Sequence, residues 1–428
     1  MKITAVSVGT RGDVQPLIEL GVELRGRGHD FRVAALEKFR PLAEEKHVPF
    51  LHLDGDADRV MQLLVTDYVT SADFMNGCKT LYRETPRFMD TLMEAIEGSD
   101  LVLYGILSGF ARHVCDYYGI PCARYFYSPF DRTNLYSLYT VKHDHPLVGM
   151  SYAMIEPGMN LLTCQLVNNW RKEHGLKKWR MTDDYRVQNG KKVLTFYPVT
   201  PLFMPPDSKW EEHIHVTGYW YHPQADAADY VPAPELERFL TAAKNDAEKP
   251  IFICFGKAQS PELAKLQRLT LEALRETKLR AIVQADQITK EEQTALTNHS
   301  NDSQLYFVDN IPYSWIFPRV KAVVHHGGNT TNGLGIRAGC PTLVIPLALD
   351  QYFYGRTIHE NGCGPAPLYI RKKLCSKAQL KSALLDLASG RYDRRAGELS
   401  ALLRRENGCK DAADIIEHFL ASYSASSL

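Results

Sequence analysis

The sequence has no excess of charge of either sign and no long apolar run. Its 428 residues include 50 lysines and arginines against 50 aspartates and glutamates, so the formal net charge at pH 7 is zero. Balanced charge gives no general electrostatic reason to expect a nucleic acid as a partner. No apolar stretch approaches the length of a membrane-spanning helix, and no signal peptide precedes the first predicted strand. We therefore expect no integral membrane segment, and only peripheral membrane contact stays open.

Cysteine is present but never in a C-x-x-C pair. Several cysteines lie within apolar runs. Such thiols are typical of structural side chains in a reducing compartment, not of a disulfide framework or a zinc site. The sequence therefore predicts reduced thiols, a cytoplasmic location and no metal site. The nine positions are Cys78, Cys115, Cys122, Cys164, Cys254, Cys340, Cys363, Cys375 and Cys409.

Length and composition indicate two α/β domains. Hydrophobic residues make up 45% of the chain, and its 23 prolines and 28 glycines are ordinary for a globular protein. A chain of 428 residues exceeds what one hydrophobic core usually organises. The segment 223–234 contains three prolines and is the best linker candidate. We predict an N-terminal domain at 1–222 and a C-terminal domain at 235–428, which includes the closing helices.

The most informative stretch runs from Val320 to Thr331. An apolar run to Val324 predicts a buried strand, and two histidines and two glycines follow it at 325–328. The glycines let the backbone turn tightly, and Asn329 to Thr331 are natural caps for a helix at 332–338. The N–H groups of such a helix start attract anions, and an imidazole can donate to a phosphate oxygen. The alternative is that the two histidines only end a strand.

A second predicted strand, at 342–346, is followed by Asp350 and Gln351. Their carboxylate and amide would emerge at the same sheet edge, where ligands of open α/β sheets bind. Phosphate-binding groups after one strand and hydroxyl-reading groups after the next together suggest a nucleotide-sugar.

The chain begins with a strand at 3–8, a helix opened by Pro16 and a strand at 31–36, which is a Rossmann-like β-α-β start. A dinucleotide-binding dehydrogenase is one alternative. In that class, the pyrophosphate contacts the backbone directly at glycines. The bulky residues after Gly9 would block this contact, which disfavours a dehydrogenase function. Asp13 follows in the same loop, where it either faces the cleft or caps the next helix.

An aromatic-rich segment from Tyr125 to Tyr139 precedes an irregular polar stretch. Aromatic side chains stack on rings, which suits a pocket for a flat or lipophilic molecule, but a surface patch and plain packing are alternatives. The His143-Asp144-His145 triplet offers two ligands with no third in register, so we expect no metal there. From Asp54 to Glu84 the pattern has no clear period.

These motifs resemble the donor-site signature of family 1 glycosyltransferases, in the manner of the sterol glucosyltransferases and the bacterial antibiotic glycosyltransferases. The matching residues are His325 to Thr331, Gly339-Cys340-Pro341 and Asp350-Gln351. The segments from Gly9 to Pro16 and from Arg25 to Ala34 also resemble the sterol type. The resemblance covers most of the second half and the first 36 residues, and it is weak between 54 and 200, where the acceptor would be recognised.

The resemblance implies a GT-B architecture, in which two Rossmann-like α/β domains face a central cleft and the C-terminal helix crosses back to the first domain. It implies an inverting, metal-independent transfer of glucose from UDP-glucose to a hydroxyl of a lipophilic or aromatic natural product, such as a sterol, a polyketide or a phenol. UDP-glucose is then a donor substrate, and no cofactor is needed. The acceptor would bind the first domain and the UDP-sugar the second.

Residue roles follow from the same resemblance. Asp13 would be the catalytic base, because the histidine that plant members use in this loop is absent here. General-base help contributes typically about 10²–10⁴-fold. His325 and the turn at 329–331 would hold the diphosphate, while Asp350 and Gln351 would hold the sugar hydroxyls, with Gln351 favouring glucose over galactose.

The loop from Val308 to Pro312 would contact the uracil. Lys257 replaces the usual serine, and it either adds charge beside the diphosphate or points to solvent. Gly333 stands where plant members bind the ribose with a glutamate. The complete predicted donor set is Gly12, Gly256, Lys257, Val308, Ile311, His325, Gly327, Gly328, Asn329, Thr330, Thr331, Asp350 and Gln351.

Two other classes compete with this interpretation. A nucleotide-sugar epimerase of the same architecture would act on a UDP-sugar without an acceptor, and the aromatic region argues against it. A binding protein that has lost catalysis would not need Asp13, His325, Asp350 and Gln351 together.

Overall fold

The computed structural model describes residues 1–55, 71–136, 148, 152, 155–222, 230–256, 261–298, 304–347, 350–369 and 375–425. The chain divides into two compact units. Unit 1 comprises Met1–Tyr221 together with Asn407–Leu428, and unit 2 comprises His222–Glu406. This division differs from the predicted boundaries at the C-terminus, because the residues after Asn407 cluster with unit 1.

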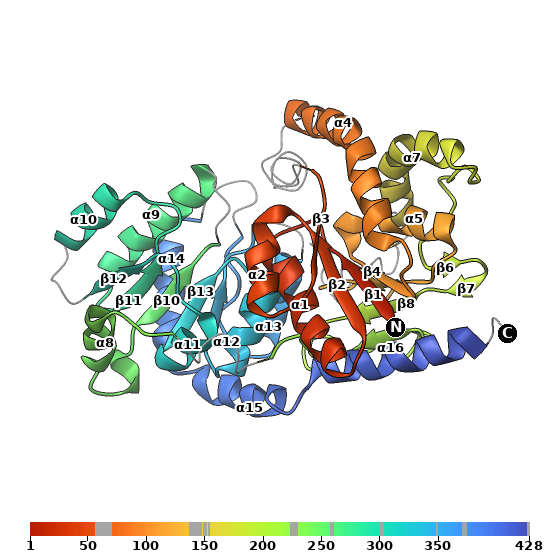
Figure 1. Ribbon diagram of the computed structural model, residues 1–428. Coiled ribbons are helices and arrows are strands. Elements are labelled where there is room, and N and C mark those ends of the chain that lie inside the picture. Colours follow the sequence, from red (N-terminus) through yellow and green to blue (C-terminus); the bar gives the residue numbers. More distant parts are fainter. Residues whose placement is uncertain are drawn as a thin grey trace. The chain divides into compact units, whose positions relative to one another are not determined.

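Unit 1 is built on a seven-stranded sheet in the order β3-β2-β1-β4-β5-β8-β9 (Figure 1). All its strand pairs are parallel. Helices cover such sheets on both faces, which explains why short runs such as Leu101–Tyr104 are apolar without alternation. The strands are β1 (Lys2–Val6), β2 (Asp30–Ala35), β3 (Phe50–His52), β4 (Leu101–Tyr104), β5 (Cys122–Tyr125), β8 (Leu194–Tyr197) and β9 (Ile214–Val216), with a small hairpin of β6 (Val187–Gln188) and β7 (Lys191–Lys192).

Two hydrophobic clusters hold the helices of unit 1 to its sheet. One cluster joins residues of α1 and of the last helix, α16, to the strands, and the other joins residues of α4, α5 and α7 to them. The segment 71–84, whose sequence shows no clear period, lies within α4. Gly77 and Pro86 weaken the helical signal there. The helices are α1 (Arg11–Gly26), α2 (Arg40–Glu45), α4 (Ser71–Ile96), α5 (Ala111–Tyr118), α7 (Ile155–Glu173) and α16 (Gly408–Ala425), with 3₁₀ turns η1 (Glu37–Phe39) and η2 (Ile106–Ser108).

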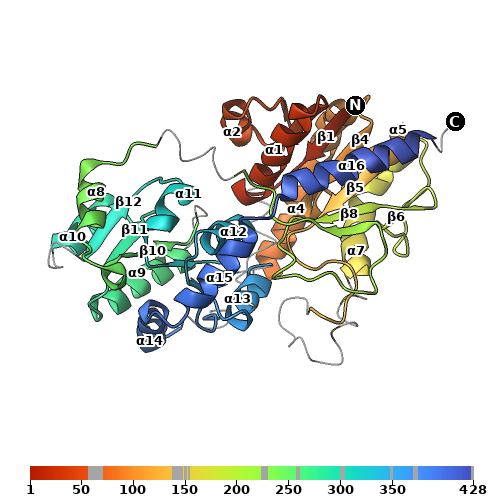
Figure 2. The same ribbon diagram turned by 90° about the horizontal axis from the view of Figure 1, so that it is seen from below.

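The last helix, α16, packs beside α1 (Figure 2). Arg27, which follows α1, donates hydrogen bonds to Asp414 Oδ1 at 2.6 Å and to Glu417 Oε2 at 2.9 Å. At the start of α16, a Cβ on Gly408 would lie 2.4 Å from the Gly218 carbonyl oxygen, so only glycine allows this approach. The chain therefore returns to complete the core of unit 1, as the predicted fold class requires.

Unit 2 contains a five-stranded sheet in the order β12-β11-β10-β13-β14, again with parallel pairs (Figure 1). One hydrophobic cluster includes residues of α9 and α14, and a second includes residues of α8 and α11. The strands are β10 (Ile251–Cys254), β11 (Ala281–Gln284), β12 (Leu305–Val308), β13 (Ala322–His325) and β14 (Thr342–Val344). The helices are α8 (Pro234–Thr241), α9 (Pro261–Arg275), α10 (Lys290–Asn298), α11 (Tyr313–Ile316), α12 (Asn329–Arg337), α13 (Gln351–Glu360), α14 (Lys377–Ala388) and α15 (Asp393–Leu403), with 3₁₀ turns η4 (Asp246–Glu248) and η5 (Phe317–Arg319).

Some predicted features lie outside the described residues, namely Lys257, the triplet at 143–145 and residues 223–229 of the linker. Pro234, the last residue of the predicted linker, begins α8. Within the described ranges, no helix is both long and apolar enough to cross a membrane. No three His, Cys, Asp or Glu side chains in those same ranges group as metal ligands.

Candidate functional site

The strand order of each sheet reverses beside its first strand, and the predicted site residues follow those strands. In unit 2, β10 lies between β11 and β13, and Cys254 pairs with His325. In unit 1, β1 lies between β2 and β4, and Val6 pairs with Tyr104. Ligands of open parallel sheets bind at the carboxyl edge where the order reverses. Each unit therefore presents one candidate site at that edge.

A glycine turn forms the floor of the unit 2 site. Gly327 has φ +98°, and a Cβ there would lie 2.7 Å from Val344 Cγ1 and 3.1 Å from the Gln351 carbonyl oxygen. A Cβ on Gly328 would lie 2.9 Å from His326 Nε2. A Cβ on Gly256, which has φ +83°, would lie 3.3 Å from Cε1 of the same ring. A side chain at any of these three glycines would therefore come close to neighbouring atoms. At Gly256 and Gly328 the neighbouring atoms belong to the His326 ring.

Asn332, which was not among the predicted site residues, holds this turn. Its side-chain amide donates to the carbonyl oxygens of Gly327 at 2.8 Å and of Gly328 at 2.9 Å. Asn332 is fully buried in α12. Asparagine is a poor helix former, so its place in the first turns of a glycine-initiated helix was the signal that could have revealed this role.

Helix α12 begins at Asn329 with Gly328 as its N-cap. Asn329, Thr330 and Thr331 were predicted as caps, and this detail is wrong because they form the first turn. The first helical bond runs from the Asn332 N–H to the Gly328 carbonyl at 3.0 Å. The N–H groups of residues 329–331 thus precede the hydrogen-bond ladder, at the positive end of the helix dipole.

The two histidines differ in access. His325 is fully buried, and its Nδ1 accepts a hydrogen bond from the Gly327 N–H at 2.9 Å, which leaves the proton on Nε2. Burial lowers the pKa of His325 well below its usual value. His326 keeps some exposure, but the surrounding protein lowers its pKa to about 4. Both rings are therefore neutral near pH 7, and His326 is the more accessible of the two.

Four buried polar atoms around this turn have no hydrogen-bond partner among the residues that the structure describes. They are His325 Nε2, His326 Nδ1, Thr330 Oγ1 and Asn332 Oδ1. Buried polar groups are nearly always paired, so such a concentration within one short stretch calls for a functional explanation. Imidazole and hydroxyl donors beside a helix N-terminus suit an anionic ligand such as a phosphate.

The remaining predicted donor residues surround the same edge. Asp350 is the N-cap of α13, and Gln351, its first residue, accepts a hydrogen bond from the Leu347 N–H at 2.7 Å. Val308 ends β12, and its carbonyl accepts from the Ala285 N–H at 3.0 Å. Ile311 is buried in the cluster that contains Trp315. The structure thus gathers these residues with the glycine turn at the carboxyl edge of one sheet.

Asp13 belongs to the unit 1 site. It was expected in a loop, but it lies in the first turn of α1, as does Gly12. Its Oδ2 accepts hydrogen bonds from the Thr10 N–H at 2.7 Å and the Thr10 hydroxyl at 2.8 Å, and Oδ1 takes part in neither. Burial raises the pKa of Asp13, and the two bonds from Thr10 oppose that rise. A Cβ on Gly9 would lie 2.4 Å from Oδ2, so glycine makes room for the carboxylate.

Known proteins share this sequence pattern along nearly the whole chain. A family described as the C-terminal domain of erythromycin biosynthesis protein CIII-like proteins matches residues 269–414. A sterol 3-beta-glucosyltransferase of Yarrowia lipolytica is 30% identical over 425 residues, which cover 97% of this chain and 28% of the relative. One from Candida albicans is 30% identical over 428 residues, with 97% and 27% covered. The chain therefore spans less than a third of the length of these relatives.

Solved structures share the fold at lower identity. A calicheamicin glycosyltransferase matches with a TM-score of 0.70 at 16% identity, over 99% of both chains. The kitacinnamycin glycosyltransferase matches with a TM-score of 0.68 at 18% identity, over 97% of this chain and 98% of that one.

The chain forms two α/β units, each with a parallel sheet, and its last helix packs on the first unit. These features define the GT-B fold of the neighbouring structures. The matches in sequence narrow this class further. By sequence, the chain is similar to glycosyltransferases of this kind over 97% of its length, in agreement with the family 1 resemblance of its motifs.

Proposed function

We propose that this chain transfers glucose from UDP-glucose to a hydroxyl of a lipophilic small molecule, with inversion at the anomeric carbon. The observation that carries the proposal is the group of unpartnered polar atoms around the glycine turn of unit 2. The relatives named as sterol 3-beta-glucosyltransferases support glucose as the sugar and a sterol-like acceptor. The partners are then a UDP-sugar and a small acceptor, without nucleic acid.

In this proposal the diphosphate lies against the start of α12. The N–H groups of residues 329–331, the Thr330 hydroxyl and the His326 imidazole supply neutral donors to its oxygens. These donors stabilise the charge that develops as the bond from the diphosphate to the sugar breaks. Asp350 and Gln351, at the start of α13, accept from and donate to the sugar hydroxyls.

Asp13 supplies the base from unit 1. Its raised pKa makes the carboxylate a stronger base than an exposed aspartate, provided that it is ionised. The acceptor hydroxyl gives its proton to Asp13, its oxygen bonds to the anomeric carbon, and the nucleoside diphosphate leaves with the bonding electrons. One displacement of this kind inverts the anomeric configuration.

Calorimetric titration with UDP and UDP-glucose in the presence of EDTA tests the donor site. We expect both to bind the wild-type chain. Thr330→Ala should weaken UDP binding roughly tenfold or more, because it removes a donor to an anion without breaking an internal bond. Thr241→Ala, which removes an exposed hydroxyl on α8, should leave UDP binding unchanged.

Two further outcomes would redirect the proposal. A spinosyn rhamnosyltransferase of the same fold has been solved with thymidine diphosphate, so binding of dTDP without UDP would reassign the donor nucleotide. Incubation of UDP-glucose without an acceptor distinguishes transfer from epimerisation, because only an epimerase would form a second UDP-hexose detectable by NMR.

A further inference from the structure

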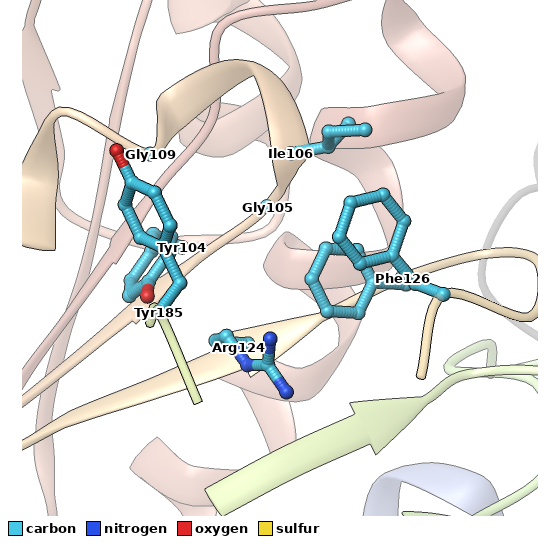
Figure 3. Close-up of a pocket in the computed structure, with 8 residues that line it drawn as sticks. Tyr104, Gly105, Ile106, Gly109, Arg124, Phe126 and Tyr185 are labelled. Carbon is cyan, nitrogen blue, oxygen red and sulfur yellow. The ribbon is translucent and has the colours of Figure 1, made fainter. Parts of the chain in front are cut away.

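A cavity opens at the carboxyl ends of β4 and β5 in unit 1 (Figure 3). Tyr104 ends β4, and Arg124 and Phe126 lie at the end of β5. Figure 3 shows the Arg124 guanidinium below a space that has the Tyr104 and Tyr185 rings on one side and Phe126 on the other. The full lining is Tyr104, Gly105, Ile106, Gly109, Arg124, Phe126, Phe130 and Tyr185.

Two buried polar atoms of this lining have no hydrogen-bond partner within the described part of the chain. They are Arg124 Nη1 and the Tyr104 hydroxyl, on side chains that are 1% and 2% exposed. The rest of the guanidinium is well bonded, since Nη2 donates to Asp131 Oδ1 at 2.8 Å and to Thr195 Oγ1 at 2.9 Å. The ion pair thus holds Arg124 in place, while its Nη1 can still donate to a ligand atom.

The charge of Arg124 is already balanced. Asp131 pairs with it, and the Tyr197 hydroxyl donates to the other oxygen of Asp131 at 2.7 Å. A second carboxylate would bring an unbalanced charge into a buried site, which is costly. Burial raises the pKa of Tyr104 well above its usual value, so its hydroxyl keeps its proton and can donate. An uncharged oxygen that accepts from both donors is therefore the group that fits.

The walls favour a ring beside that oxygen. Phe126 and Phe130 are stacked with ring centroids 4.2 Å apart, and Tyr185 faces the cavity from the other side. The volume of about 260 Å³ includes the open mouth. The enclosed part measures only about 10 Å³, which is room for about one water-sized group, so it can take a single ligand oxygen while the rest of the ligand lies in the mouth.

We propose that Arg124 Nη1 and the Tyr104 hydroxyl anchor an uncharged carbonyl or hydroxyl oxygen at one end of a ring-bearing acceptor. This inference rests on the proposed function in calling the ligand an acceptor. The cavity lies on the same sheet edge as the start of α1. Gly105 packs against Tyr125, with a Cβ that would lie 2.8 Å from the ring, and the Tyr125 hydroxyl donates to the Val6 carbonyl at the end of β1.

Direct binding to the 428-residue chain, without donor, tests the anchor. The probes are a 3-hydroxysteroid that carries a ketone at the opposite end of its ring system and the same steroid without the ketone. We expect the wild-type chain to bind the ketone more tightly. Tyr104→Phe should reduce that preference roughly three- to tenfold, the usual effect of one hydrogen bond. It breaks no internal bond, so it should fold. Tyr117→Phe, at an exposed site on α5, should leave the preference unchanged.

Gly109→Ala provides a second variant. Its Cβ would lie 3.6 Å from the Ile106 carbonyl oxygen and 3.9 Å from Tyr185 Cε1, which are ordinary contacts, so it narrows the cavity without strain. It should weaken binding of the ketone probe more than that of its analogue. Equal binding of the two steroids in all variants, or binding of neither, would overturn the inference. A Tyr104-dependent ketone preference in a chain that transfers no glucose would support the anchor and refute the proposed function.

Discussion

At the scale of single residues, Asp13 combines two tasks. As the third residue of α1, it accepts hydrogen bonds from Thr10 and so stabilises the helix start. The same position leaves Oδ1 outside that pair and surrounds the carboxylate with protein, which raises its pKa. A carboxylate that is held by one oxygen and desolvated is well suited to accept a proton through the other.

The substitution Asp13→Asn should test the role of this residue as the base. The asparagine side chain keeps an oxygen for the Thr10 N–H but cannot take up the proton of the acceptor hydroxyl, so kcat should fall by about 10²–10⁴-fold while the Kd for UDP is unchanged. Steady-state rates and UDP calorimetry measure the two effects. Asp90→Asn, at an exposed position on α4, is the control. Activity within a few-fold of wild type would remove Asp13 from the mechanism and make Asp350 the next candidate.

The pH dependence of kcat/KM should respond to Thr10. A base works only when deprotonated, so the raised pKa of Asp13 makes activity fall at a higher pH than an ordinary aspartate would. The Thr10 hydroxyl bond lowers that pKa, and Thr10→Val removes it. The acid limb of the profile should therefore move to higher pH in Thr10→Val. If the acid limb of the kcat/KM profile of Thr10→Val stays in place or moves to lower pH, a group other than Asp13 determines that limb.

At the scale of elements, the donor site depends on how β13 turns into α12. Gly327 packs between Val344 of β14 and the start of α13, and Asn332 ties the turn from within the helix. This packing brings Asp350 and Gln351 beside the glycine turn, although they are more than 20 residues away in the sequence. The N–H groups of α12 are aimed by the turn, so a change in the turn should alter binding as well as stability.

Gly327→Ala should therefore weaken UDP binding and lower the free energy of unfolding by about 1–3 kcal/mol, because its Cβ meets Val344 and its φ is positive. Gly335→Ala is the matched control in the same helix. Its Cβ would lie 3.4 Å from Thr342 Oγ1, at an ordinary φ, so stability and binding should be near wild type. Denaturant unfolding and calorimetry compare the two variants. Equal stability and equal UDP binding of the two variants would contradict the claim that Gly327 packs too closely for a side chain.

At the scale of the whole molecule, the end of the chain completes the core of its beginning. Ile416 and Leu420 of α16 are buried in the cluster that contains Leu17 and Leu20 of α1. The ion pairs of Arg27 with Asp414 and Glu417 are partly exposed and contribute less than this burial. The stability of unit 1 therefore depends on residues that follow unit 2 in the sequence.

Ile416→Ala should lower the free energy of unfolding of unit 1 by about 2–5 kcal/mol, the usual cost of emptying a buried isoleucine site. UDP binding should be unchanged, because the proposed donor residues lie in unit 2. Thermal unfolding followed with and without UDP measures both effects. His418→Ala, on the exposed side of α16, should have little effect on either. Loss of UDP binding in Ile416→Ala would contradict this separation.

Local sequence patterns were sufficient to predict the β-α-β start of unit 1 and the strand, glycine turn and helix at the donor site of unit 2. The pattern from Val320 to Thr331 was readable without the structure, because an apolar run marks the buried strand and glycines and polar residues follow it. The resemblance to family 1 glycosyltransferases, now confirmed, rested on such local motifs. The roles of Asp13 and of the donor residues stay predictions.

Contacts between distant segments could not be read from these patterns. The access of His326 compared with His325 depends on which strand face packs inward, and the burial of Arg124 depends on Asp131 and on Thr195, 71 residues away. The two residues that carry the unpartnered atoms of the unit 1 cavity, Tyr104 and Arg124, are paired only because β4 and β5 are neighbours in the sheet. Sequence periodicity records the local preference of each element, whereas burial, pairing and cavities arise from the packing of elements against one another.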